Sequence, residues 1–428
     1  MTRSTSIRTI GVIGAVLAAA ALGLAACAPE PVPATSPSPS ASTSPEPYNG
    51  PAVFVGDELD LLLLTPEEIA RVLPGATEIS DPSSTLEQIS DGGGPEPAPA
   101  ICFALFAEQS LRSVGSRTVS WDVPADPEVG IGRLHVLQFA DEAQAQARMD
   151  QLVAAAEQCA RFDYNGPAIF DSVTAEPGDN ARAFAGTLSI DEIEGGGSMF
   201  HAFAAVGNVI VQLWHPTLPE SPADAQATAD LLRDRAEEAR AALFEDLTAN
   251  PPTPEQPPTT DAAAPWGEWP ITADGVGPIL LSDTVDVALA AVEGAQVQEP
   301  TYDGGPWTLT NADGSASMQI DVQEEDDTKI SSITVGNSRT HDEAVQDGTV
   351  LPSRGDVRVG ALVADAVAAY PGGTSVSVVS SGDEWYDAST RDGHVFRFRT
   401  DRAASDPAAV IVGITVADAT MWPTPDFR

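Results

Sequence analysis

Five histidines are the first side chains whose chemistry could define a site: His135, His201, His215, His341 and His394. His201 and His215 lie on the two arms of an expected hairpin and His135 on a neighbouring strand, so these three could converge. A zinc site, however, needs three or four ligands at fixed distances, and the usual HxxxH, HExxH and CxxC spacings are missing. We therefore expect ordinary surface or edge histidines, no metal site and no cofactor.

Nucleophiles and carboxylates offer no clearer sign of catalysis. The Gly-x-Ser-x-Gly elbow of many serine hydrolases is absent, and the single lysine, Lys329, lies in no phosphate-binding glycine-rich motif. The acidic run Glu324-Glu325-Asp326-Asp327 lacks the alternating ligands and central glycine of an EF-hand loop, so it predicts a solvated hairpin turn. A glycosidase-like carboxylate pair could still meet in space. We assign no catalytic residue and expect a protein that is not an enzyme.

The charge balance limits the partners. The chain has 21 Lys and Arg against 63 Asp and Glu, a formal charge of −42. Nucleic-acid binding needs clustered basic residues, so nucleic acid is excluded as a partner. The same charge opposes peripheral binding to anionic lipid, so membrane attachment would have to be covalent.

Cys27 follows the features of an exported lipoprotein. Arg3 and Arg8 precede an apolar run from Ile10 to Leu24, which is the pattern of an export signal and is short for a membrane span. The run ends in Leu24-Ala25-Ala26-Cys27, which resembles the lipobox of bacterial lipoproteins. The resemblance implies that residues 1–26 are a signal peptide and that Cys27 carries a diacylglycerol. The alternative is a plain secretory signal followed by an unrelated cysteine.

A lipid on Cys27 would hold the protein on the extracytoplasmic face of the cell membrane, because two acyl chains suffice for stable anchoring. Residues 27–50 are rich in Pro, Ser and Thr after the cysteine. Such a segment cannot bury apolar surface, so it predicts an extended tether.

Cys102 and Cys159 are the two remaining cysteines. An exported pair in an oxidising compartment is most simply a disulfide. Closing a loop of this length would stabilise the fold by about 4 kcal/mol in the chain-entropy model. Two free buried thiols are the alternative.

A second Pro/Thr-rich stretch, residues 249–266, predicts a linker between two domains, residues 51–248 and 267–428. Both mix helical and strand patterns, so we expect an α+β fold, with a mixed sheet and flanking helices in the first domain.

Several local signals define the first domain. Thr65 and Glu68 predict a capping box at the start of a helix of about residues 66–73, and Pro66 suits its first helical position. Alternating residues on either side of Gly207-Asn208 predict a β-hairpin. Longer helices are expected from Asp141 to about Cys159 and from about Pro222 to Phe244.

These motifs resemble the extracellular sensor domain of mycobacterial PknH-type Ser/Thr kinases and the lipoproteins that carry the same module. The resemblance rests on the run Leu62 to Glu68, on Cys102 after a polar loop, and on the run His135 to Asp141 that leads to Cys159. It covers most of residues 57–247. It implies an α+β fold with a cleft for an unidentified ligand.

The chain departs from that family in two respects. The family commonly has a second disulfide, for which no cysteines are left here, and it often has a tryptophan where this chain has Ala156.

The second domain contains an internal duplication, with repeats of about residues 275–337 and 353–418. Most matched positions keep an offset of 78 residues, among them Trp307 with Trp385, and the last strand shifts by three more. Each copy predicts a short strand, one helix and then three strands. The two tryptophans could be exposed anchors for a protein or sugar, or core residues under the helix of each repeat.

We expect an extracytoplasmic ligand-binding or sensing lipoprotein, with an unknown small molecule or protein as its ligand. The alternative is a protein-interaction or inhibitor-like lipoprotein, because the duplicated domain weakly resembles the tandem repeats of β-lactamase-inhibitor-type proteins. A polar cleft in the first domain would favour sensing. An exposed concave apolar patch on the second would favour protein interaction.

Overall fold

The computed structural model describes residues 47–89, 97–107, 109–124, 130–164, 166–190, 198–217, 220, 222–253, 260–323, 326, 328–340 and 344–423. The expected signal peptide, Cys27 and most of the tether lie outside these ranges. So do His341 and three residues of the acidic run, Glu324, Glu325 and Asp327. Within these ranges, no helix has both the length and the apolar character that a membrane span requires.

The first sheet has seven strands in the order β2-β3-β8-β7-β6-β5-β4. Their bounds are β2 Gly115–Val123, β3 Gly130–Gln138, β4 Phe162–Asp163, β5 Pro167–Thr174, β6 Arg182–Ile190, β7 Ser198–Val206 and β8 Val209–Pro216. The fold is α+β as expected, but every pair in this sheet is antiparallel rather than mixed. Short connections impose that direction on the pairs of successive strands, and the pair β3-β8 joins strands that are far apart in the sequence. The expected hairpin is β7-β8, with Gly207 at φ 53° in its turn.

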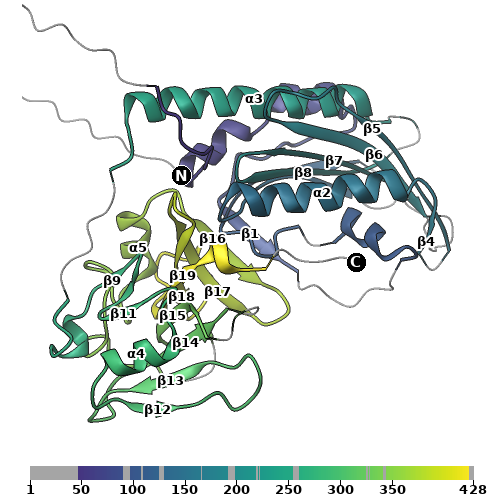
Figure 1. Cartoon of the computed structure of the whole chain (residues 1–428). Helices are drawn as coiled ribbons and strands as arrows, with labels where there is room; N and C mark the ends of the chain where they lie inside the picture. Colours follow the sequence, from purple (N-terminus) through teal and green to yellow (C-terminus); the bar gives the residue numbers. More distant parts are fainter. Residues whose placement is uncertain are drawn as a thin grey trace, which may run out of the picture. The chain divides into compact units, whose positions relative to one another are not determined.

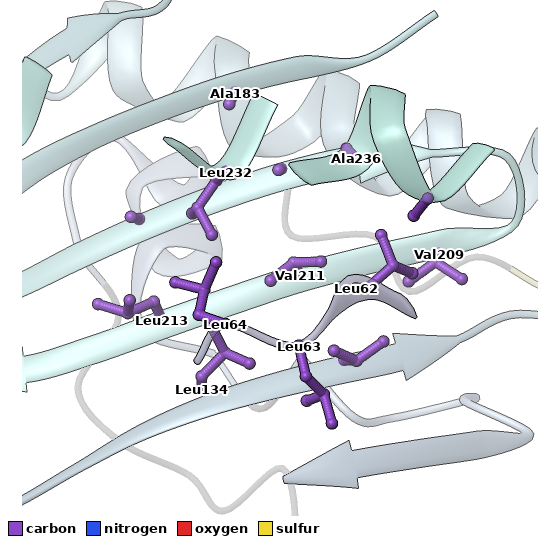
Figure 2. Close-up of a cluster of buried hydrophobic side chains, with 14 of the residues drawn as sticks. Leu62, Leu63, Leu64, Leu134, Ala183, Val209, Val211, Leu213, Leu232 and Ala236 are labelled. Carbon is purple, nitrogen blue, oxygen red and sulfur yellow. The ribbon is translucent and has the colours of Figure 1, made fainter. Parts of the chain in front are cut away.

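Helices cover both faces of this sheet (Figure 1). The long helix α3 (Ala225–Ala249) packs on one face together with the 3₁₀ helix η1 (Gly56–Leu62) and with α1 (Pro66–Val72). Figure 2 shows this core, where Leu64 lies beside Leu213 of the sheet and Leu62 lies beside Val209. The leucine run of the sequence is therefore a core element.

The expected capping box is confirmed at the start of α1. The Thr65 hydroxyl accepts from Glu68 N–H at 3.2 Å, and the Glu68 carboxylate accepts from Thr65 N–H at 2.8 Å.

On the opposite face, α2 (Glu142–Gln158) packs against the 3₁₀ helix η2 (Ala100–Leu105) and the sheet. The disulfide between Cys102 and Cys159 joins η2 to the residue that ends α2. Both cysteines are fully buried in the same core. The structure thus contains the disulfide expected from the sequence.

The second sheet has nine strands in the order β1-β16-β17-β18-β19-β15-β14-β13-β12. Their bounds are β1 Thr85–Gln88, β12 Gln296–Gln298, β13 Trp307–Thr310, β14 Ser317–Val322, β15 Ile330–Gly336, β16 Thr374–Val378, β17 Asp383–Ser389, β18 His394–Thr400 and β19 Ile411–Asp418. Helices α4 (Val285–Ala291) and α5 (Val363–Ala369) contribute to one shared core on one face of this sheet. Three two-residue strands, β9 Ile271–Thr272, β10 Gly275–Val276 and β11 Ile279–Leu280, form a separate small sheet.

The duplication is visible in this sheet as two copies of a helix followed by four strands. The extra strands relative to the expected plan are the short β12 and its counterpart β16. The copies join edge to edge through the antiparallel pair β15-β19. At the centre of that pair, the equivalent residues Thr334 and Thr415 lie opposite each other and their hydroxyls are hydrogen-bonded at 2.8 Å. An approximate two-fold axis therefore passes between these two threonines.

The expected equivalence of Trp307 and Trp385 is wrong, because the strands that carry them are shifted by one residue between the two repeats. Trp307 pairs with Ile320, whereas Trp385 pairs with Arg399 rather than with Phe398. A one-residue shift turns a side chain to the other face of a sheet. Trp307 is consequently half-buried on the side of α4 and α5, and Trp385 is buried on the opposite side, 7% exposed. Neither is an exposed anchor.

Residues 77–88 pair with both sheets. Thr77 and Ser83 bridge to β2 of the first sheet, and β1 then runs parallel to β16 of the second. We call residues 47–253 the N-terminal lobe and residues 260–423 the C-terminal lobe. Leu86 of β1, Val376 and Trp385 belong to the same core as α2 and the disulfide. The two lobes therefore share a hydrophobic core as well as strand pairing.

Arg117 of β2 reinforces this junction. Its side chain is buried, and Nη2 donates to the carbonyl of Gly372 in the C-terminal lobe at 2.9 Å. The same guanidinium pairs with Asp57 at 2.9 Å and Asp60 at 2.8 Å in the N-terminal lobe. Beside it, Ser116 N–H donates to the Thr374 hydroxyl at 2.8 Å.

We predict that Arg117→Met lowers the free energy of unfolding by about 1.5–3 kcal/mol, the range for hydrogen bonds to charged groups. The matched control is Arg182→Met, because Arg182 also pairs with an aspartate, Asp150, but is 41% exposed. An exposed pair contributes at most about 1 kcal/mol. Urea unfolding followed by tryptophan fluorescence measures both variants. Equal losses would show that Arg117 has no special role at the junction.

Candidate functional site

The histidines of the expected hairpin lie on opposite faces of the first sheet. His201 is on the side of α2, and His215 is on the side of α3, where its Nδ1 accepts from Trp121 Nε1–H at 3.0 Å. Burial lowers the pKa of both side chains to about 4. The expectation of surface or edge histidines is therefore wrong for this pair, because helices cover both faces of the sheet.

The other described histidines also have local protein partners. His135 Nδ1 lies 3.1 Å from the Thr118 hydroxyl, and burial together with the charge of Arg133 lowers its pKa to about 4. His394 contacts Asp392 at 3.2 Å; burial opposes its charge, but the carboxylate outweighs burial and raises the pKa. In the described ranges, no group of three or more His, Cys, Asp or Glu side chains is arranged to hold a metal ion.

Asp326 is the described member of the acidic run. It lies in the connection between β14 and β15, and its Oδ1 accepts from the backbone N–H and the hydroxyl of Thr328 at 3.2 and 2.6 Å. These hydrogen bonds lower the pKa of Asp326 and hold a turn.

A cleft of about 510 Å³ opens on the second sheet. The strands explain which side chains face it, because side chains alternate between the two faces of a strand. Met318, Ile320 and Phe396 point into the core with α4 and α5, whereas their neighbours Gln319 and Arg397 line the cleft. The cleft therefore lies on the face opposite the two helices.

A row of polar side chains forms the floor of the cleft. Each is the direct cross-strand partner of the next, over five adjacent strands from β13 to β18. The row consists of Thr308, Gln319, Thr334, Thr415 and Arg397. The two-fold axis between the repeats thus passes through the middle of the site.

Asp321 and Ser332 lie beside this row on β14 and β15. The Ser332 hydroxyl donates to Asp321 Oδ2 at 2.7 Å. Burial raises the pKa of Asp321, and the hydrogen bond from Ser332 offsets only part of that effect. Two aromatic side chains, Tyr302 and Trp422, also line the cleft.

Arg397 and Arg399 are held rigidly at one side of the cleft. Arg397 donates through Nε and Nη2 to both oxygens of Asp387, each at 2.9 Å, and Arg399 donates through Nη1 to Asp383 at 2.9 Å. Both guanidinium groups lie over the ring of Trp385, at 4.1 and 5.3 Å from its centroid. The bidentate pairing of Arg397, the single hydrogen bond of Arg399 and the cation–π contacts of both hold these groups in place.

The ionisation of these groups follows from their surroundings. Burial, and then repulsion from Arg397, lower the pKa of Arg399 to about 10, so it stays charged at neutral pH. Burial opposes the charge of Asp383, but the hydrogen bond from Thr340 N–H and the charge of Arg399 outweigh it and lower the pKa. Both arginines on this side of the cleft are thus charged and paired with carboxylates.

None of these cleft residues was singled out from the sequence. The available signal was the alternation of polar and apolar residues, as in Met318-Gln319-Ile320-Asp321 and Phe396-Arg397-Phe398-Arg399. Alternation alone does not tell whether the polar face is bare surface or the floor of a cleft. Pairing across strands far apart in the sequence decides this.

No family model matches the chain, and no curated protein sequence matches it. The solved structures that are similar to it include two mycobacterial proteins. The extracellular domain of PknH from Mycobacterium tuberculosis is 14% identical, and the match covers 47% of this chain and 99% of that one, with a TM-score of 0.29. An uncharacterised Mycobacterium smegmatis protein, an ortholog of Rv0999, is 16% identical over 44% of this chain and 97% of its own, with a TM-score of 0.26. We draw no functional conclusion from similarity at this level.

We predict that Asp321→Asn raises the melting temperature at pH 7 but not in acid. The raised pKa means that burying the ionised carboxylate costs stability above the unfolded-state pKa of about 3.9, whereas below it the carboxyl is protonated in both states. Asparagine carries no charge and can still accept from Ser332. Thermal unfolding between pH 3 and pH 7 tests this, with the exposed Asp303→Asn as control. A gain that persists in acid would contradict the assignment.

Proposed function

We propose that this protein is a lipid-anchored, extracytoplasmic binding protein that takes a small polar ligand into the cleft on the second sheet and does not transform it. The observation that carries the proposal is the row of polar side chains from Thr308 to Arg397, which five strands hold in register on an open face. Small-molecule sites are pockets of about 300–1,000 Å³ with a few well-placed polar groups, and this cleft has that size.

The composition of the cleft favours a small ligand over a protein partner. An inhibitor-like repeat was expected to expose a concave apolar patch, whereas the described floor is made of Thr, Gln and Arg side chains. Protein interfaces place aromatic and apolar groups at their centre and polar groups at the rim. The arrangement here is the reverse, with polar groups central and Tyr302 and Trp422 among the other lining residues.

The location is proposed from the sequence. Arg3, Arg8 and the apolar run to Leu24 suit export, and Cys27 follows where the small residues Ala25 and Ala26 end that run. A disulfide between Cys102 and Cys159 suits an oxidising compartment.

We predict that Cys27→Ser abolishes lipid attachment and releases the protein from the membrane fraction. The reason is that two acyl chains on one cysteine would supply the whole anchoring energy. Metabolic labelling with an alkynyl palmitate, followed by membrane fractionation, measures both effects. The control is Cys102→Ser/Cys159→Ser, which removes two cysteines but keeps Cys27 and should remain labelled. A Cys27→Ser variant that stays membrane-bound would refute the anchor.

We predict that Thr415→Phe removes ligand binding, because a phenyl ring at the centre of the floor fills the cleft without entering the core on the helix side. Saturation-transfer NMR with a panel of sugars, polyols, amino acids and hydroxy acids is the measurement. Thr174→Phe, on the exposed part of β5, is the matched control. Compounds that bind the wild type and the control should lose their signal with Thr415→Phe. Binding that survives the substitution would place the site elsewhere.

A further inference from the structure

We infer that the ligand of the cleft is an uncharged carbohydrate, recognised through its hydroxyl groups. This inference rests on the proposed binding function and adds the chemical class of the ligand. It follows from the charge balance of the cleft, from the hydrogen-bonding groups left open there, and from the aromatic side chains along its walls.

The arginines of the cleft do not form a site for an anion. Arg397 is neutralised by Asp387, which is 2% exposed and accepts through both oxygens, and Arg399 is neutralised by Asp383. Glu299 and Asp321 line the cleft as well. Three lining arginines, with Arg339 as the third, thus face four carboxyl groups in the described residues. An anion would gain no net attraction here, and the formal charge of −42 would repel it.

The pairing nevertheless leaves particular N–H groups unused. Within the described part of the chain, Nη1 of Arg397 and both Nη2 and the buried Nε of Arg399 donate to no protein acceptor. Asp387 holds the other edge of Arg397, and Asp383 accepts from Nη1 of Arg399. A planar guanidinium held in this way presents donors in fixed directions.

Acceptors lie across the floor from these donors. The Ser332 hydroxyl donates to Oδ2 of Asp321, and the other carboxylate oxygen, Oδ1, accepts from no described residue. Between the two sides lie the hydroxyls of Thr334 and Thr415, which can both donate and accept. A ligand that fits must therefore accept at one side, donate at the other and do both in the middle. A polyhydroxylated molecule does all three with a single kind of group, whereas a carboxylate only accepts and an ammonium only donates.

Two aromatic side chains add the remaining feature of a sugar site. Tyr302 is 66% exposed although it is large and apolar, and Trp422 is half-buried along the same cleft. Aromatic rings provide flat apolar area with little loss of conformational entropy. Such rings can cover the C–H faces of a sugar ring while its hydroxyls reach the polar floor.

The experiment compares each neutral sugar with its uronate, which carries a carboxylate in place of the C6 hydroxymethyl group. Isothermal titration calorimetry with glucose and glucuronate, and with galactose and galacturonate, is run at low and high ionic strength, with arabinose, N-acetylglucosamine and maltose extending the neutral set. We expect at least one neutral sugar to bind with an affinity that salt changes less than about twofold, because an uncharged ligand is not screened. A matched acid is expected to bind at least about tenfold more weakly, a difference of about 1.4 kcal/mol.

Variants of the arginine–carboxylate pairs test whether their charge balance is what favours a neutral sugar over its acid. Asp387→Asn leaves Arg397 uncompensated, so we expect affinity for the neutral sugar to fall and affinity for the matched acid to rise. Asp383→Asn removes the carboxylate partner of Arg399 in the same way. Because Asp383 is more exposed than Asp387, this variant replaces Asp387→Asn if that one unfolds. Thr415→Val removes one hydroxyl at nearly constant volume and should lower the affinity for the neutral sugar by about tenfold. Thr174→Val is the matched control and should change nothing.

The outcomes separate this inference from the proposed function. Tighter binding of glucuronate or galacturonate that weakens with salt would overturn the carbohydrate inference and leave a binding cleft for anions. The carbohydrate inference would also be overturned if no neutral sugar binds while an amino acid or hydroxy acid does. If Thr415→Phe abolishes that binding, the proposed binding cleft still stands. Sugar binding that Thr415→Phe leaves unchanged would overturn both.

Discussion

The parallel pairing of β1 with β16 is the constraint on which the rest of the structure depends. It places a strand from the N-terminal lobe at the edge of the sheet built by the duplicated C-terminal lobe, so the second sheet does not form its complete edge from its own lobe. The pairing buries Leu86 and Trp385 in the core that holds α2 and the disulfide. Trp385 therefore packs in a core to which both lobes contribute. Its neighbour Tyr386 packs in the core of the C-terminal lobe. Arg117 strengthens the same junction from the side of the first sheet.

Trp385 connects this junction to the cleft. Its indole N–H donates to Asp387 at 2.9 Å, and Asp387 in turn holds Arg397. The ring also supports both arginines by cation–π contact. The geometry of the binding groups thus depends on a side chain whose position is fixed by packing against the other lobe. A site on the surface of one lobe gains its rigidity from the interface between the two.

The sequence predicts what is encoded locally. The capping box at Thr65, the hairpin at Gly207-Asn208 and the pair Cys102–Cys159 each depend on short motifs or on the cysteine count, and the structure contains all three. Long-range pairing is not encoded in this way. β1 has the sequence Thr-Leu-Glu-Gln, which has one apolar residue and no strong strand signal. The cleft was missed for the same reason, since it appears only when distant strands are paired. A one-residue shift between the copies misplaced Trp385, because register decides the face of a strand.

The position of the cleft on the axis between the repeats has a consequence for its evolution. Two identical copies would have given Gln319 and Arg397 the same identity, and likewise Asp321 and Arg399, because these residues occupy equivalent positions about Thr334 and Thr415. Such an ancestral site would have bound an asymmetric molecule equally well in two opposite orientations. Two copies within one chain can mutate independently of each other. The present difference between an amide–carboxylate half and a guanidinium half would give the proposed ligand one direction, which no symmetric dimer of a single repeat could impose.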